Sequence, residues 1–105
     1  MIQPQNKVEK IILGIDPGTM YMGYGVISVV GTKMKFIDMG ILDLKKEGDT
    51  YMKLKKVYDF TIALIDKFLP DEFAIEAQFF GKNVQSMLKL GRAQGVAIVA
   101  AMERD

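Results

Sequence analysis

The sequence contains no cysteine and no histidine. The lack of cysteine excludes disulfide bonds and thiolate zinc sites. The lack of histidine removes imidazole as a general base, as the partner of a nucleophile and as a metal ligand. Any catalysis by this chain must therefore rest on carboxylates, lysines or hydroxyl groups.

The chain also lacks an excess of either charge and any long apolar run. It has 14 basic and 13 acidic residues and a net charge of +1, so its overall charge does not indicate a nucleic-acid partner. No apolar segment is long enough to cross a bilayer, and Met1–Asn6 lacks the pattern of a signal peptide. We therefore expect a cytoplasmic protein with no membrane partner.

The first half of the chain predicts three strands in succession. Half of all residues are hydrophobic, which favours one packed domain over residues 1–105. The segments Lys10–Asp16, Met22–Val30 and Lys33–Leu42 are rich in β-branched residues and are separated by glycine-containing turns. They predict a three-stranded antiparallel meander.

The second half predicts a helix, a strand and a helix. Asp49 or Thr50 can cap a helix over Tyr51–Leu69, where apolar residues recur every three or four positions before Pro70. Glu72–Glu76 is a short strand, and a strand that follows a helical crossover is normally parallel to an earlier one. We therefore expect a mixed α/β sheet.

A last helix is predicted from the possible cap Asn83 towards Glu103. Its apolar and close-packing side is marked by Met87, Leu88, Gly91, Gly95, Ile98, Val99 and Met102. Such a side more often packs in a core, although glycines four residues apart also suit helix packing across a two-fold dimer. Because a sheet with one crossover keeps open edges and a thin core, we expect a further segment after Asp105.

Two acidic residues, Asp16 and Glu76, each end a predicted buried strand. If the two strands are parallel neighbours, both carboxylates lie at the carboxyl edge of the sheet, where ligands bind in open α/β sheets. Carboxylates brought together need a proton or a cation between them, and Mg²⁺ suits hard oxygen ligands. Mg²⁺ ions at this edge could activate water against a phosphodiester without histidine.

These residues have structural alternatives. Asp16 can simply open an Asp-Pro-Gly-Thr turn in which Pro17 sets φ and Gly18 takes a positive φ. Phe79 can stack on an unpaired base beside the cation Lys82, or it can fill space beneath the last helix. Glu76 is harder to explain structurally, because a carboxylate among apolar neighbours must be paired or bound to metal.

Basic residues form three clusters that could each contact phosphate groups, although most such clusters are solvated surfaces. In order, the clusters are Lys45 and Lys46; Lys53, Lys55 and Lys56; and Lys82, Lys89 and Arg92. For Lys45 and Lys46, a solvated surface is the better interpretation.

Four motifs together resemble the RuvC family of Holliday-junction resolvases. They read ILGIDPGT, GYGVI, FAIEAQFFGKN and LKLGRAQGVAIVAA, and the match spans nearly all of Lys10–Met102. The resemblance implies an RNase H-like fold and a homodimer that binds a four-way DNA junction. It further implies paired symmetric nicks made with Mg²⁺ by four acidic residues per subunit, and a branch-migration helicase as partner.

The resemblance also assigns roles to residues. Asp16 matches the first acid of the family and Glu76 the second, and both are the expected metal ligands. Phe79 matches an aromatic that stacks on a base, and Lys82 and Asn83 are further expected DNA contacts. The third and fourth acids belong to a carboxyl-terminal segment of the family that this sequence lacks, so we expect the chain to be inactive alone.

The chain departs from the family at a few positions. Met20 and Met22 stand where members often have a basic residue and a threonine, and Gln94 stands where arginine is common. Arg92, two residues before Gln94, could supply the missing charge.

Two other functions compete with this interpretation. An actin-like or sugar-kinase ATPase would use Asp16 for Mg-ATP, but Pro17 and the segment EAQFF do not suit that class and no second phosphate loop is seen. A non-catalytic fragment that dimerises through its last helix is the second alternative.

Overall fold

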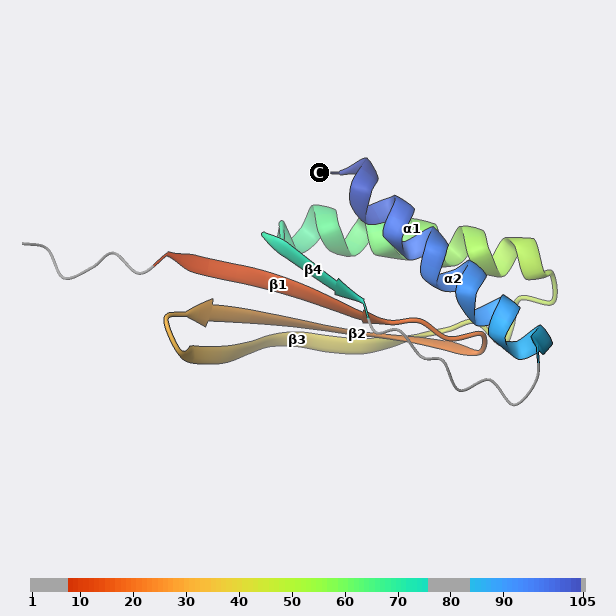
Figure 1. The fold of residues 1–105 in the computed structure, drawn as a ribbon, viewed down its shortest axis with the longest axis horizontal. Helices are drawn as coiled ribbons and strands as arrows, with labels where there is room; N and C mark the ends of the chain where they lie inside the picture. Colours follow the sequence, from red (N-terminus) through yellow and green to blue (C-terminus); the bar gives the residue numbers. More distant parts are fainter. Residues whose placement is uncertain (1–7, 76–83, 105) are drawn as a thin grey trace, which may run out of the picture.

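The computed structural model describes residues 8–75 and 84–104. The predicted order of three strands, a helix, a strand and a helix is confirmed. The elements are β1 (Glu9–Asp16), β2 (Tyr21–Val30), β3 (Lys33–Asp43), α1 (Thr50–Phe68), β4 (Glu72–Ile75) and α2 (Val84–Glu103). Both helices lie on one side of the sheet and cross each other there (Figure 1).

The four strands form one mixed sheet in the order β3-β2-β1-β4. β1 is antiparallel to β2, and β2 is antiparallel to β3, as the predicted meander requires. β4 pairs with β1 in parallel, which confirms the orientation predicted from the helical crossover. The carboxyl ends of β1 and β4 therefore meet at the same edge of the sheet.

Local sequence explains the turn and the caps. Gly31 has a φ of 64° at the first central position of the two-residue turn between β2 and β3, a conformation that favours glycine. Of the two predicted caps of α1, Asp49 is the one used, since its Oδ1 accepts a 2.7 Å hydrogen bond from the Tyr51 N–H. Leu69 ends the helix in the left-handed conformation, and Pro70 follows.

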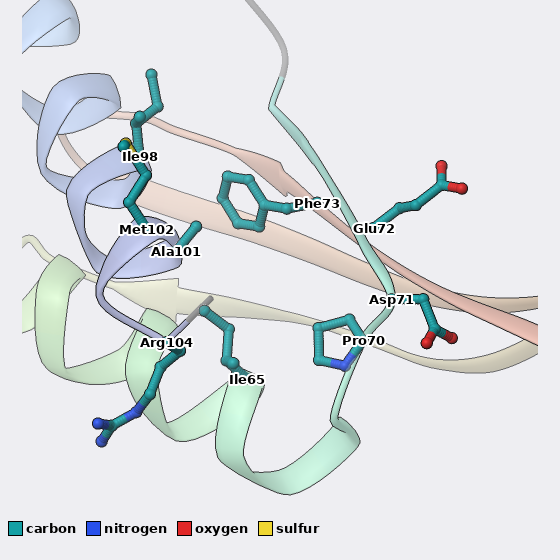
Figure 2. Close-up of a pocket in the computed structure, with 9 residues that line it drawn as sticks. All are labelled: Ile65, Pro70, Asp71, Glu72, Phe73, Ile98, Ala101, Met102 and Arg104. Carbon is teal, nitrogen blue, oxygen red and sulfur yellow. The ribbon is translucent and has the colours of Figure 1, made fainter.

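A hollow lies between the start of β4 and the ends of both helices (Figure 2). The ring of Phe73 points into it, towards Ile98 and Met102, whereas the carboxylates of Asp71 and Glu72 point away. The Asp71 carboxylate accepts a 2.8 Å hydrogen bond from the Ile11 N–H, and Glu72 pairs with Lys10 at 2.9 Å. These two acids are therefore engaged in joining β4 to β1, at the end of β4 opposite to the predicted catalytic edge.

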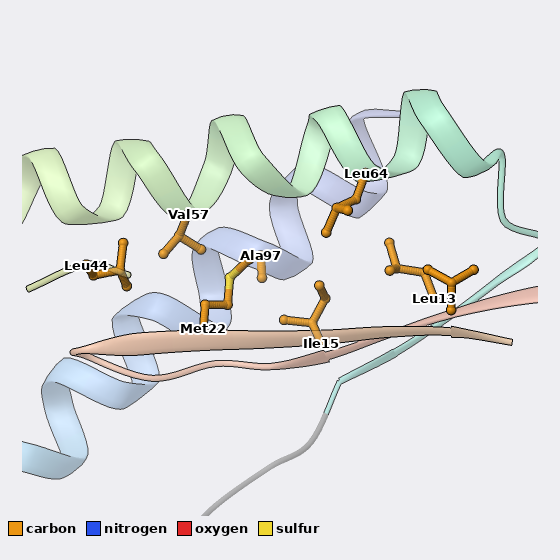
Figure 3. Packing of buried hydrophobic residues seen from close by; sticks show 8 residues of the cluster. Leu13, Ile15, Met22, Leu44, Val57, Leu64 and Ala97 are labelled. Atoms are coloured by element: carbon orange, nitrogen blue, oxygen red, sulfur yellow. The ribbon is translucent and has the colours of Figure 1, made fainter. Parts of the chain in front are cut away.

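The hydrophobic core lies between the sheet and the helices (Figure 3). The sheet contributes Leu13, Ile15, Met22 and Val26, the segment after β3 contributes Leu44, and the helices contribute Val57, Leu64 and Ala97. The buried face of α1, predicted from its apolar residues, also includes a threonine. Thr61 is fully buried, and its hydroxyl donates a 2.7 Å hydrogen bond to the Val57 carbonyl, so it can occupy an apolar stripe.

α2 does not place its predicted apolar and close-packing side in the core of the described chain, so the core interpretation of that side was wrong. Its buried side chains are Ala93, Ala97 and Ala100, whereas Val99 is 56% exposed and Met102 72% exposed. A Cβ added to Gly91 or Gly95 would meet no atom of the described residues within 4 Å. The physical reason is that small alanine side chains let the helix approach its neighbours closely, which leaves the larger side chains on the outside.

Neither helix among the described residues is long and apolar enough to cross a membrane. The sheet face opposite the helices carries exposed apolar side chains from β3, including Phe36, Met39 and Ile41. The described part of the chain therefore covers one face of its sheet.

Candidate functional site

Asp16 is the last residue of β1 and lies on the sheet face opposite the helices. Side chains alternate along a strand, so Leu13 and Ile15 are buried towards the helices while Gly14 and Asp16 face the other way. Asp16 is exposed and lines a shallow hollow of about 490 Å³ on that face. Asp16 therefore lies on the sheet face that the described helices leave uncovered.

The floor of this hollow is made largely of backbone. Gly14 pairs with Gly25 on one side and with Ala74 on the other, so three neighbouring strands carry almost no side chain there. Gly23 lies directly opposite Asp16, and a Cβ at Gly23 would come within 3.7 Å of the Asp16 Cβ. These small residues leave room beside the carboxylate for a bulky, flat or hydrated group.

The described register between β1 and β4 ends one residue before Asp16. The last described pair is Ile15 with Ile75, and the residues that follow these two in the sequence are Asp16 and Glu76. The predicted site residues Glu76, Phe79, Lys82 and Asn83 lie outside the described residues. Their predicted roles therefore stay predictions.

Among the described residues, Asp16 is the acidic side chain that lines this hollow. In residues 8–75 and 84–104, no three aspartate or glutamate side chains gather into a metal-binding group. Asp16 itself is a hard oxygen donor at an open, glycine-lined position, which suits Mg²⁺. A metal held here needs further ligands from outside the described residues.

The loop after Asp16 differs from the predicted turn. Gly31, and not Gly18, is the glycine with a positive φ in the described chain. Gly18 is instead required by proximity, because a Cβ there would collide with the carbonyl oxygen of Tyr21. The loop is also held to the end of β3, where the Leu44 N–H donates a 2.8 Å hydrogen bond to the Met20 carbonyl.

A second hollow opens at the same end of the sheet, on the side of the helices. It is lined by three cations from two of the predicted basic clusters: Lys53 of α1, and Lys89 and Arg92 of α2. The sequence placed these residues in separate clusters, and the packing of α1 against α2 brings them together. Lys55 and Lys56 are instead paired with Asp59 and Glu47.

Comparisons with known proteins agree with the predicted family. A family model described as crossover junction endodeoxyribonuclease RuvC matches residues 12–105. The protein of that name from Bacteroides fragilis is 63% identical over 105 residues, which are 100% of this chain and 55% of that protein. The chain therefore spans about half the length of this relative.

Solved structures agree with the predicted fold. A Thermus thermophilus RuvC structure has a TM-score of 0.77 and 27% identity over 89% of this chain and 58% of that one. A T. thermophilus RuvC in complex with Holliday junction substrate has a TM-score of 0.79 and 24% identity, covering 90% of this chain and 59% of that one. The predicted RNase H-like α/β fold is confirmed.

Proposed function

Because this chain belongs to the RuvC family of crossover junction endodeoxyribonucleases, we propose that it supplies part of a Mg²⁺-dependent endonuclease that resolves four-way DNA junctions. The full protein would make paired, symmetric nicks during recombination and repair. The family match favours this function over an actin-like ATPase.

The observation that carries the proposal is the parallel register of β1 and β4. Their described pairing stops at Ile15 and Ile75, one residue before each of the two carboxylates. We propose that the register continues by one residue and sets Glu76 opposite Asp16. Two carboxylates on adjacent strands then face the same glycine-lined hollow.

Asp16 and Glu76 are the proposed metal ligands and catalytic residues. Mg²⁺, when bound, supplies activation of water and neutralises charge at the scissile phosphate. The two carboxylates would bind the metal at the carboxyl edge of the sheet. There the backbone of β1 is fixed by ladder hydrogen bonds to β2 on one side and to β4 on the other. The glycine floor leaves space for the phosphate, and the remaining acids of the family would come from a segment outside this chain.

The same proposal assigns the DNA contacts and partners. Phe79 stacks on a base near the junction, and Lys82 and Asn83 contact the DNA backbone. The chain belongs to one RNase H-like nuclease domain that acts as a homodimer, receives junctions from a branch-migration helicase and works in the cytoplasm. The exposed face of α2, with Gly91 and Gly95 open to a neighbour, supports the homodimer.

The proposal is tested by nicking of a synthetic four-way junction in the presence of Mg²⁺. This chain is compared with a version extended to the length of its relatives, and with Asp16→Asn and Glu76→Gln in the extended version. We expect only the unmodified extended protein to cut, because the third and fourth acids expected from the resemblance would lie in the segment that the extension adds. An extended protein that leaves junctions intact would overturn the proposed function.

The homodimer is tested separately by sedimentation. Bulky residues in Gly91→Leu and Gly95→Leu would prevent two helices from approaching closely, and a Cβ at either position would meet nothing within 4 Å in the described chain. We expect the double variant to stay folded but to sediment as a monomer. An unchanged oligomeric state would remove α2 from the proposed interface.

A further inference from the structure

The hollow on the helix side of the β1 carboxyl end has the composition of an anion site. It measures about 270 Å³ and lies where the loop after Asp16 meets the first halves of α1 and α2. Lys53, Lys89 and Arg92 line it, together with the threonines Thr19 and Thr50. Cations and hydroxyl groups are the side chains that bind phosphate oxygens.

The three cations of this hollow differ from three other basic side chains on or next to the helices. Lys55, Lys56 and Arg104 each form an ion pair at 3.3 Å or less. Within the part of the chain that the structure describes, no acidic side chain pairs with Lys53, Lys89 or Arg92. Like charges held around one hollow repel each other, and an anion between them removes that repulsion.

The lining of the hollow also includes buried residues of the core. Leu44 and Val57 are each 1% exposed and Ala93 is 3% exposed, so the residues between the cations belong to the packed core. An apolar floor lowers the local dielectric constant and strengthens each contact between a cation and an anion. The hollow is thus an ordered part of the fold, built by the contact between α1 and α2.

The cationic hollow, which is lined by Lys53, Lys89 and Arg92, and the hollow beside Asp16 lie on opposite sides of the sheet at the carboxyl end of β1. Asp16 faces one side of the sheet, and the loop containing Thr19 leads from it to the lining of the cationic hollow. A DNA strand whose scissile phosphate lies at Asp16 can pass over the end of β1. Such a strand would have backbone phosphates on both sides of the strand end.

We propose that Lys53, Lys89 and Arg92 hold one backbone phosphate of the DNA strand next to the cleavage site. This inference rests on the proposed function, because it takes DNA as the ligand. The contact is independent of base sequence, since it is made to phosphate. It therefore positions the strand and adds affinity without selecting a sequence.

The first test is the salt dependence of DNA binding by the chain. Fluorescence anisotropy measures binding of a labelled four-way junction and of a duplex at several salt concentrations. A variant with Lys53→Gln, Lys89→Gln and Arg92→Gln is compared with Lys33→Gln and Lys35→Gln, which remove two exposed cations at the opposite end of the sheet. We expect the triple variant to bind both DNAs several-fold more weakly, with a salt slope smaller by about 0.9.

The outcomes separate the two proposals. If the unmodified chain binds DNA and the triple variant keeps both its affinity and its salt slope, the cationic hollow is not a phosphate site and the proposed function stands. If neither the unmodified chain nor its extended version binds the junction or the duplex, the proposed function fails. The cationic hollow then has no DNA to bind. A control variant weakened as much as the triple variant would show only a general charge effect and overturn the specific site.

A second measurement needs no variant and so does not depend on variant folding. Lysines of the unmodified chain are acetylated with and without the junction, and the extent of modification is read by mass spectrometry. We expect the junction to protect Lys53 and Lys89 several-fold while Lys33 and Lys35 react equally in both samples. Equal protection of all four lysines, or none at Lys53 and Lys89, would overturn the proposal.

Discussion

The hydroxyl group of Tyr24 donates a 2.8 Å hydrogen bond to Oδ2 of Asp38 across strands β2 and β3. Tyr24 lies opposite Gly40 in the ladder, and its ring also contacts Phe60 of α1 edge to face, with centroids 5.6 Å apart. Because Gly40 has no side chain, the ring can lie across β3 and reach Asp38. This arrangement ties the edge strand of the sheet to the helical layer.

Gly40→Ala should destabilise the fold. The new Cβ would lie 2.7 Å from Cε1 of Tyr24, so the ring must move away from Asp38 and Phe60. We expect a loss of about 1 kcal/mol, read from urea unfolding monitored by circular dichroism. Gly25→Ala is the matched control, since its Cβ would meet nothing within 4 Å. Equal unfolding midpoints for the two variants would contradict the prediction.

The stability of the chain should fall at high pH. The hydrogen bond to Asp38 is the main cause that raises the pKa of Tyr24 above its ordinary value of 10.0, and burial and the charge of Asp38 add to it. A raised folded-state pKa means that the stabilisation is complete below the unfolded pKa and is lost as pH rises through the folded one. Hydrogen bonds to Glu72 and Asp59 likewise raise the pKa values of Lys10 and Lys55.

Ultraviolet absorbance titration of tyrosine checks the cause of this shift. In Asp38→Asn the carboxylate is gone, so the pKa of Tyr24 should fall towards its ordinary value of 10.0. Tyr24→Phe identifies which part of the titration belongs to this residue. An unchanged tyrosine titration in Asp38→Asn would show that Asp38 is not the cause of the raised pKa of Tyr24.

Gly18→Ala should disturb the loop that follows Asp16. The added Cβ would collide with the Tyr21 carbonyl oxygen, and a backbone atom cannot rotate away as a side chain can. We expect a loss of more than about 1 kcal/mol in the free energy of unfolding. Gly48→Ala, whose Cβ has open space, is the control. A thermal melting temperature equal to that of the control would contradict the observed loop geometry.

Substitutions on α2 should distinguish its two faces. Ala97 is fully buried, so Ala97→Leu adds volume to a packed core and should cost about 1–3 kcal/mol in urea unfolding. Val99→Leu on the exposed face should change stability by less than about 0.5 kcal/mol. If Val99→Leu were the more damaging change, the originally predicted packing side of α2 would be correct.

Local sequence was sufficient to predict most of the fold. The β-branched runs, the Asp49 cap and the crossover led to the observed strands, helices and parallel β4, because these features depend on backbone conformation and on general connection rules. The position of Asp16 at the carboxyl edge followed from the same reasoning. Glu76 was selected by the same reasoning and Phe79 by its place beside the presumed site, and the resemblance to the family then assigned a role to each. Both lie outside the described residues, so those roles stay predictions.

The sequence by itself determined the classes of chemistry that the chain can use, its order of elements and its family. Only the tertiary structure decided which stripe of α2 is buried, why Gly18 must be glycine and which cations share a hollow. α2 carries both an alanine stripe and a stripe of larger apolar residues, and the choice between them depends on how closely its neighbours approach. Lys53 lines one hollow with Lys89 and Arg92 for the same reason: side chains far apart in the sequence become neighbours only when helices pack.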